Sequence, residues 1–131
     1  MNSAVFPEQI EAQCGPVTAL DLALYAAASG DHNPLHLDLA VANAAGFDKP
    51  VVHGMLSMAY AGRMLTEIFG PVALLSLSTR FIGVAKLGDT VSLTGKRTEL
   101  MDGTACYSLS ARNASGTELL SGAAKIGARV R

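Results

Sequence analysis

The 131-residue sequence has little charge, little cysteine and no excess of either sign of charge. Its 10 lysines and arginines face 11 acidic residues, so it lacks the basic footprint expected of a protein that binds nucleic acid or an anionic membrane. The two cysteines, Cys14 and Cys106, lie far apart and do not have metal-ligand spacing. We therefore expect no nucleic-acid partner, and we expect both cysteines to be reduced and structural.

Targeting and membrane-spanning segments are also missing from the sequence. Residues 1–13 carry no basic stretch followed by an apolar stretch, which a secretory signal would need. No window approaches the roughly 18 uninterrupted apolar residues of a membrane span. Half of the residues are nevertheless hydrophobic, and the length suits one domain with its own core. These features predict a single cytoplasmic domain over residues 1–131 with no membrane partner.

Two short helices are predicted in the first part of the chain. Thr18 and Asp21 have the spacing of an N-terminal capping pair for a helix over about residues 19–28. Asp38 can cap a second helix, which stops at Gly46.

A third and longer helix is predicted over residues 54–69. Apolar residues cover almost its whole circumference and leave Arg63 and Glu67 as a charged pair four residues apart on a narrow strip. We therefore expect this helix to be deeply buried.

After residue 71 the hydrophobic period changes to the alternation of β-strands. Turn signals separate the alternating segments, which we interpret as a C-terminal meander with one further strand at an edge. The expected strands lie near residues 75–81, 91–94, 105–111 and 118–128, with the edge strand at 10–14.

Helices followed by strands predict an α+β domain, in which one apolar helix lies against a curved antiparallel sheet of about five strands. A single sheet wrapped on one long helix is the hot-dog fold. Such a domain is thin for its size and leaves its outer strands unpaired. We therefore expect a homodimer or a higher homo-oligomer.

The most informative segment is residues 29–36, which read SGDHNPLH. Pro34 has no amide hydrogen and directs Asn33 toward extended geometry, so Asp31 and His36 lie on a curled segment instead of neighbouring helical turns. A carboxylate and an imidazole can together accept and donate a proton near neutral pH. This pair is typical of a site that adds or removes water.

The SGDHNPLH segment, the sequence PVVHGML at residues 50–56, and Gly88-Asp89 before a strand closely resemble the MaoC-like, R-specific enoyl-CoA hydratases of hot-dog fold. The resemblance covers about residue 18 to the C-terminus. It implies a hydro-lyase that interconverts trans-2-enoyl-CoA and (R)-3-hydroxyacyl-CoA. Water is the nucleophile in this reaction and the thioester activates the acyl group, so we expect no metal or redox cofactor.

The resemblance also assigns roles to individual residues. Asp31 and His36 match the catalytic dyad, and the glycine that matches Gly54 offers its backbone N–H to the thioester oxygen. Gly54 begins the third predicted helix, where unpaired amides and the helix dipole favour negative charge. Which member of the dyad is the acid and which the base stays open, because a coupled pair shares its protons. The residues predicted to bind substrate are Asn33, His53 and Met55.

Several of these residues also have ordinary structural interpretations. Asp31 could cap the turn after the first helix, and Asn33 with Pro34 is common turn chemistry. Asn33 either orients the dyad or only shapes this turn. His53 is expected to brace the loop before Gly54 more than to transfer protons.

Two other functions remain open at this point. One is a 3-hydroxyacyl carrier-protein dehydratase of fatty-acid synthesis, acting alone or as half of a heterodimer, although the weak net charge gives no clear basic patch for a carrier. The other is a non-catalytic hot-dog partner subunit, which would need neither Asp31 nor His36. A thioesterase is less favoured, because the long helix offers only Glu67 beside Arg63 as an acidic residue.

Overall fold

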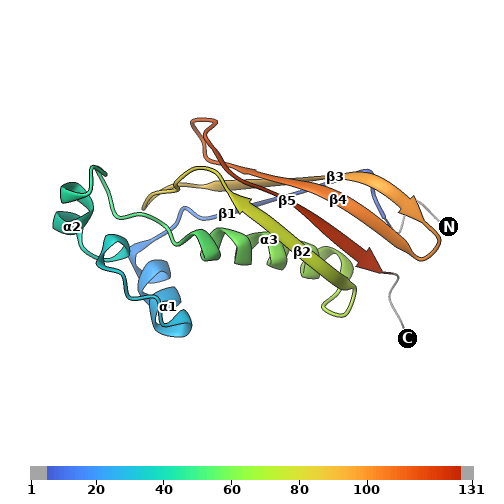
Figure 1. The fold of residues 1–131 in the computed structure, drawn as a ribbon, viewed down its shortest axis with the longest axis horizontal. Helices are drawn as coiled ribbons and strands as arrows, with labels where there is room; N and C mark the ends of the chain where they lie inside the picture. The colour runs from blue at the N-terminus through green and yellow to red at the C-terminus, as the bar shows by residue number, and fades with distance from the viewer. Residues whose placement is uncertain (1–5, 128–131) are drawn as a thin grey trace.

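The computed structural model describes residues 6–127 of the chain. The helices and strands occur in the predicted order (Figure 1). The helical elements are α1 (Ala19–Ser29), the short 3-10 helix η1 (Pro34–His36), α2 (Leu39–Ala44) and α3 (Gly54–Phe69). The strands are β1 (Gln9–Cys14), β2 (Leu74–Phe81), β3 (Val91–Met101), β4 (Thr104–Arg112) and β5 (Glu118–Gly127).

The five strands form one antiparallel sheet in the order β1-β3-β4-β5-β2. This sheet and α3 together make the predicted α+β hot-dog architecture, with β1 at an edge as expected. The prediction of a four-strand meander is wrong for β2, which pairs with β5 and not with β3. Alternation of apolar residues fixes the two faces of a strand but not its neighbour. Residue 128, the last of the predicted final strand, lies outside the described residues.

Helix α3 lies against one face of the sheet and contacts β1, β2, β3 and β5 (Figure 1). Burial of each large apolar side chain on this face contributes roughly 1.5–3 kcal/mol to folding. The buried residues of α3 are Leu56, Ser57, Tyr60, Ala61, Met64, Leu65 and Phe69.

The expectation that α3 is buried on nearly all sides is wrong. Met55 is 52% exposed, and together with the exposed Ala59, Arg63 and Glu67 it forms one open face of the helix in this single chain. Ile68, near the end of the helix, is also 41% exposed. Arg63 Nη2 donates a hydrogen bond to Cys14 Sγ at 3.2 Å, and none of the ion pairs in the described part of the chain joins Arg63 to Glu67.

The caps predicted for the short helices are confirmed. Thr18 and Asp21 form a reciprocal capping box at the start of α1, and Gly30 ends this helix in the left-handed conformation with φ 79°. Glycine adopts this conformation without strain, so the chain can turn sharply into the segment that carries Asp31. Asp38 caps α2 by accepting a hydrogen bond from the Ala40 amide at 2.9 Å.

The loop between β2 and β3 supports the segment that precedes α3. The Asp89 side chain accepts a hydrogen bond from the Lys86 amide at 2.9 Å, which closes a turn in this loop. The Val52 amide then donates to the Ala85 carbonyl at 2.8 Å, and Val51 forms an isolated β-bridge with Lys86. These backbone contacts fix residues 50–53 immediately before α3.

Cys14 and Cys106 are both free thiols, in agreement with the prediction. None of the described helices is long and apolar enough to cross a lipid bilayer.

Candidate active site

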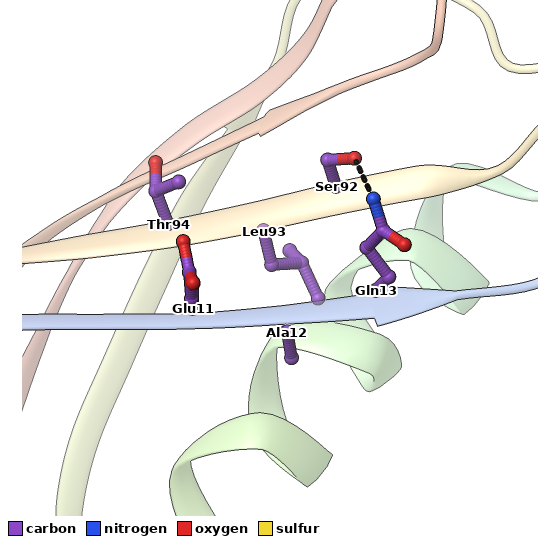
Figure 2. Close-up of a pocket in the computed structure, with 6 residues that line it drawn as sticks. All are labelled: Glu11, Ala12, Gln13, Ser92, Leu93 and Thr94. Atoms are coloured by element: carbon purple, nitrogen blue, oxygen red, sulfur yellow. Dashed lines mark hydrogen bonds between the residues drawn. The ribbon is translucent and has the colours of Figure 1, made fainter.

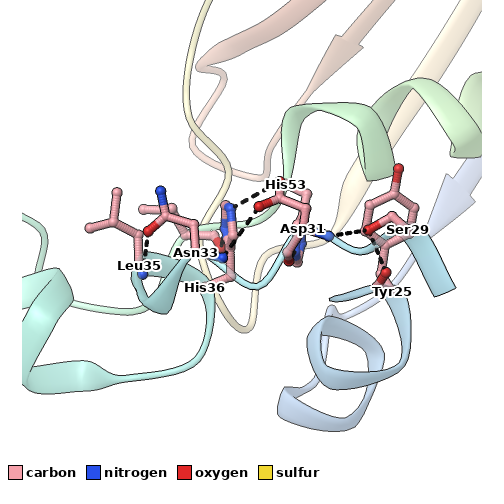
Figure 3. A network of polar contacts seen from close by, with 8 residues as sticks. Tyr25, Ser29, Asp31, Asn33, Leu35, His36 and His53 are labelled. Carbon is pink, nitrogen blue, oxygen red and sulfur yellow. Dashed lines mark hydrogen bonds and ion pairs between the residues drawn. The ribbon is translucent and has the colours of Figure 1, made fainter. Parts of the chain in front are cut away.

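Asp31 and His36 approach each other at the end of the domain where α3 begins (Figure 3). His36 Nε2 lies 3.6 Å from Asp31 Oδ2, and the His36 side chain is 11% exposed against 52% for Asp31. His36 Nδ1 lies 2.8 Å from the Val51 carbonyl oxygen. Because a carbonyl can only accept, Nδ1 carries a hydrogen and Nε2 is the ring nitrogen that can gain or lose a proton.

Hydrogen bonds within the SGDHNPLH segment explain its curled shape. The Asp31 amide donates to Ser29 Oγ at 3.2 Å, the Asn33 amide to Asp31 Oδ1 at 3.3 Å, and the Leu35 amide to Asn33 Oδ1 at 3.0 Å (Figure 3). Side chains of this type that bond to backbone two residues away replace regular helix in turns. One carboxylate oxygen of Asp31 thus shapes the turn, and the other faces His36.

His53 lies beneath the dyad and is only 1% exposed. Its ring stacks on the His36 ring with centroids 3.7 Å apart and planes 20° apart. Its Nε2 lies 3.2 Å from the Asp31 carbonyl oxygen, whereas Nδ1 is buried and has no partner in the described part of the chain. Burial lowers the pKa of His53, and the adjacent His36 adds to this effect, while the bond to the Asp31 carbonyl opposes it.

Gly54 is the first residue of α3, as predicted. Within the described residues, neither its amide nor that of Met55 has an acceptor, whereas the Leu56 amide bonds to the His53 carbonyl at 3.0 Å. A Cβ on Gly54 would lie 3.3 Å from the Phe81 ring. The free amides, the helix dipole and the absence of a side chain together make a site for an oxyanion.

The structure gives less direct support for substrate binding by Asn33, Met55 and His53. Asn33 Oδ1 is used in its own turn, so the side chain shapes the loop and only the Asn33 amide contacts Asp31. Met55 is 52% exposed at the first turn of α3. His53 is too deeply buried to contact a substrate in this conformation.

Two contributors to the site are absent from the sequence prediction. The Val51 carbonyl fixes the His36 ring, and no side-chain pattern signals a backbone acceptor. Tyr25 sets its ring edge-on to His53 with centroids 4.8 Å apart. Its place on α1, one turn before the motif that begins at Ser29, was the only available signal.

Asp31, His36 and His53 each offer one potential metal-ligand atom within 4.8 Å of the others. Carbonyl oxygens engage His36 Nδ1 and His53 Nε2, which leaves His36 Nε2 and His53 Nδ1 as the possible ligand atoms. Because the two rings stack, these nitrogens point along nearly parallel planes instead of toward one point. The arrangement therefore suits proton transfer better than metal coordination.

A separate hollow lies over β1 and β3, away from the dyad (Figure 2). Its lining includes Gln13 and Ser92, whose side chains hydrogen-bond to each other at 3.3 Å. Neither the dyad nor the start of α3 contributes to it, so we assign it no part in the chemistry.

Comparison with known families now identifies the domain. The model of the MaoC like domain matches residues 5–116. The chain belongs to the MaoC-like dehydratase family. Among solved structures, the unliganded R-hydratase PhaJ1 from Pseudomonas aeruginosa superposes with a TM-score of 0.85 and 32% identity, covering 94% of this chain and 81% of that one. The (R)-hydratase from A. caviae, described as involved in PHA biosynthesis, gives a TM-score of 0.83 and 28% identity, with 92% and 94% covered.

The MaoC-like domain also matches longer curated proteins. It is 40% identical over 99 residues to 3-hydroxyacyl-thioester dehydratase Y of Mycobacterium tuberculosis, which covers 72% of this chain and 34% of the relative. Two fungal peroxisomal hydratase-dehydrogenase-epimerases match over 7% of their length. The chain therefore spans about a third or less of these curated relatives.

Proposed function

We propose that this MaoC-like domain is a hydro-lyase that interconverts trans-2-enoyl-CoA and (R)-3-hydroxyacyl-CoA. The observation that carries the proposal is the 3.6 Å approach of His36 Nε2 to Asp31 Oδ2 beside the free amides of α3. The two structural neighbours, which share the fold over nearly the whole chain, are both named as R-hydratases, and this supports the proposal. The R configuration rests on these relatives alone.

The dyad geometry supports a mechanism in which Asp31 and His36 hold one water molecule between them. During hydration the water oxygen bonds to C3 of the enoyl thioester, and the C2=C3 electron pair moves toward the thioester oxygen. One member of the dyad accepts a proton from the water, and the other gives a proton to C2 on the same face. The two groups then hold the same total number of protons as before, so the cycle balances.

The developing negative charge on the thioester oxygen needs donors that are in place before the reaction. The amide of Gly54 is proposed for this role because it is free, begins a 16-residue helix and carries no side chain. The residue before it, His53, stacks on His36, so the donor lies close to the acid–base pair. Met55, the next residue of α3, and Asn33 remain predicted substrate-binding residues.

A hollow of about 530 Å³ is proposed to bind part of the CoA ester, although neither dyad residue lines it. Leu37 follows His36 directly and Pro50 precedes Val51, so the hollow adjoins both backbone segments that hold the imidazole. Lys49 lines the hollow and offers a cation for a phosphate group. Asp48 lines it too, and its carboxylate pairs with Lys86 at 2.7 Å. The apolar part of the lining comprises Ala19, Leu37, Leu39, Pro50 and Leu87.

We also propose that the active form is a homodimer in the cytoplasm. Strand β2 is an edge strand, and apolar side chains on it and beside it are exposed. An uncovered apolar edge of this kind favours pairing with a second copy. The exposed residues are Val72, Leu75, Phe81, Ile82 and Val84. Light scattering on the purified chain would contradict the dimer if it gave the mass of a monomer at micromolar concentration.

The test of the proposed activity is the loss of enoyl absorbance with crotonyl-CoA and with a longer 2-enoyl-CoA. Asp31→Asn should lower kcat by about 10²-fold or more, as expected when an acid–base group is lost. Asp102→Asn, which removes an exposed carboxylate in the β3–β4 turn, is the matched control and should keep native activity. Treatment with a chelator should leave the rate unchanged.

Native protein that is folded and dimeric but inert on both CoA esters would contradict the proposal. The same assay should then be repeated with a carrier-protein thioester, because the relative in M. tuberculosis is named for thioesters without restriction to CoA. Activity on the carrier ester alone would establish the carrier-protein dehydratase instead. Activity only after addition of a second hot-dog chain would indicate a non-catalytic partner subunit.

A further inference from the structure

His53 contacts both members of the dyad, although it is buried beneath them and cannot contact substrate directly. Its Nε2 meets the backbone carbonyl of Asp31 at 3.2 Å, and its ring face meets the ring face of His36 at 3.7 Å. Tyr25 packs edge-on against the same imidazole, with ring centroids 4.8 Å apart. No other described side chain is hydrogen-bonded to one of the pair and stacked on the other.

The hydrogen-bonding pattern defines the charge state in which His53 can make both contacts. Because the Asp31 carbonyl only accepts, His53 Nε2 carries the hydrogen, and Nδ1 is then unprotonated in the neutral ring. A proton on Nδ1 would be a buried donor without an acceptor in the described part of the chain. A charged His53 would also repel a charged His36 across the stack. Both arguments favour a neutral His53, in which Nδ1 is a buried acceptor without a donor in the described part of the chain.

We propose that His53 is a positioning residue of the hydration reaction, whose buried imidazole holds Asp31 and His36 at the separation that one bridging water needs. The proposal rests on the proposed hydratase function and deepens it. The hydrogen bond fixes the backbone from which the Asp31 carboxylate extends. The stack fixes the plane of the His36 ring, so that Nδ1 meets Val51 and Nε2 faces the carboxylate. Errors of about 1 Å in such a placement can cost about 10²-fold in rate.

Two substitutions separate the two contacts. His53→Phe keeps a flat ring against His36 and removes the donor to the Asp31 carbonyl, whereas His53→Gln keeps an N–H donor and removes the ring. Each variant should lower kcat on crotonyl-CoA by about 10-fold or more with KM changed less than about threefold, because the substrate itself loses no contact. Tyr107→Phe is the matched control, since it removes one buried hydrogen bond, from the Tyr107 hydroxyl to the Pro7 carbonyl, far from the site.

Two further readouts distinguish positioning from a general loss of stability. The first is the pH profile of kcat/KM, in which at least one limb should move by half a pH unit or more in both His53 variants and not in Tyr107→Phe. The second is the NMR shift of the His36 ring protons, which the stacked ring displaces. This displacement should persist in His53→Phe and disappear in His53→Gln, and it is measurable whether or not the protein is active.

The outcomes are decisive in both directions. Folded His53 variants with native kcat and an unmoved pH profile, together with unchanged His36 signals in His53→Gln, would overturn the positioning role. An equal loss of kcat in Tyr107→Phe would show that the effect reflects stability. If one variant does not fold, the other is sufficient, because each removes a different contact. Native protein that shows the displaced His36 signals but hydrates neither CoA ester would refute the proposed function while leaving the His53 contacts intact.

Discussion

The substitution His36→Asn tests the two ring nitrogens of the dyad imidazole separately. The side-chain nitrogen of asparagine occupies about the position of His36 Nδ1, so it can still donate to the Val51 carbonyl, which lies 2.8 Å from Nδ1 in the native protein. Asparagine has no atom at the position of Nε2 and cannot exchange a proton near neutral pH. The variant therefore keeps the structural bond and loses the acid–base group.

The expected magnitudes follow from these two contacts. Val51 is 6% exposed, and removal of its hydrogen-bond partner in His36→Ala would leave a buried carbonyl unsatisfied. That loss costs roughly 1–3 kcal/mol of unfolding free energy, whereas His36→Asn should cost less than about 1 kcal/mol. Both variants should lose about 10²- to 10⁴-fold in kcat, because each lacks the proton-transferring nitrogen.

Chemical denaturation and the crotonyl-CoA assay together provide the test. The protein concentration is held fixed, because the stability of the proposed dimer would depend on it. A His36→Asn protein with at least a tenth of native kcat would refute the assignment of Nε2 as an acid–base atom. Equal destabilisation of His36→Asn and His36→Ala would refute the structural role assigned to the bond between Nδ1 and Val51. The two conclusions are independent, because they come from different measurements.

Three other substitutions are informative. Gly54→Ala should lower kcat/KM by 10-fold or more, because the new Cβ would lie beside the proposed oxyanion donor. Stability in an unfolding titration should change little, because the Cβ would lie 3.3 Å from the Phe81 ring, which is half-exposed and can move. The pKa of His53 lies below 6.5 in the folded chain, so the unfolded chain binds more protons between the folded pKa and 6.5. The free energy of unfolding should therefore decrease as the pH falls through this range. In His53→Phe, denaturant unfolding at several pH values should show that this part of the pH dependence is lost. Gly122→Ala should cost roughly 1–3 kcal/mol in denaturant unfolding, because its Cβ would overlap the backbone oxygen of Ser78 on the neighbouring strand; an unchanged midpoint would contradict the register of β2 on β5.

The caps and the helix boundaries could be predicted from the sequence because they depend on residues a few positions apart. The reciprocal bonds of Thr18 and Asp21 are an example, since both partners lie within one helical turn. The neighbour of β2 could not be predicted in this way. Its pairing with β5 joins residues that are 39 to 52 positions apart, from Phe81 with Leu120 to Leu74 with Ile126. The alternation of Leu77 and Thr79 with polar residues is compatible with either neighbour.

The same distinction explains the burial of α3. Composition indicates an apolar helix, but it does not reveal how many sides the rest of one chain can cover. The sheet covers only the face that includes Leu65, and Met55 and Ile68 remain exposed at opposite ends of the helix. An apolar residue on an uncovered face has the same sequence signature as a core residue. This exposure is a further reason to expect a second copy, in addition to the thin sheet and unpaired outer strands that the sequence already indicated.

The candidate site shows where a local motif is informative and where tertiary contacts take over. The spacing of Asp31 and His36 around Pro34 was sufficient to predict that a carboxylate and an imidazole converge, because the whole loop is local. The tautomer of His36 was not predictable, since it depends on the backbone carbonyl of Val51, 15 residues away. The placement of His53 depends on the same long-range packing. From the sequence, a histidine before a helix-starting glycine could either support the loop or bind substrate. Only the stacking on His36 and the hydrogen bond to the Asp31 carbonyl show that the buried His53 side chain contacts both members of the dyad.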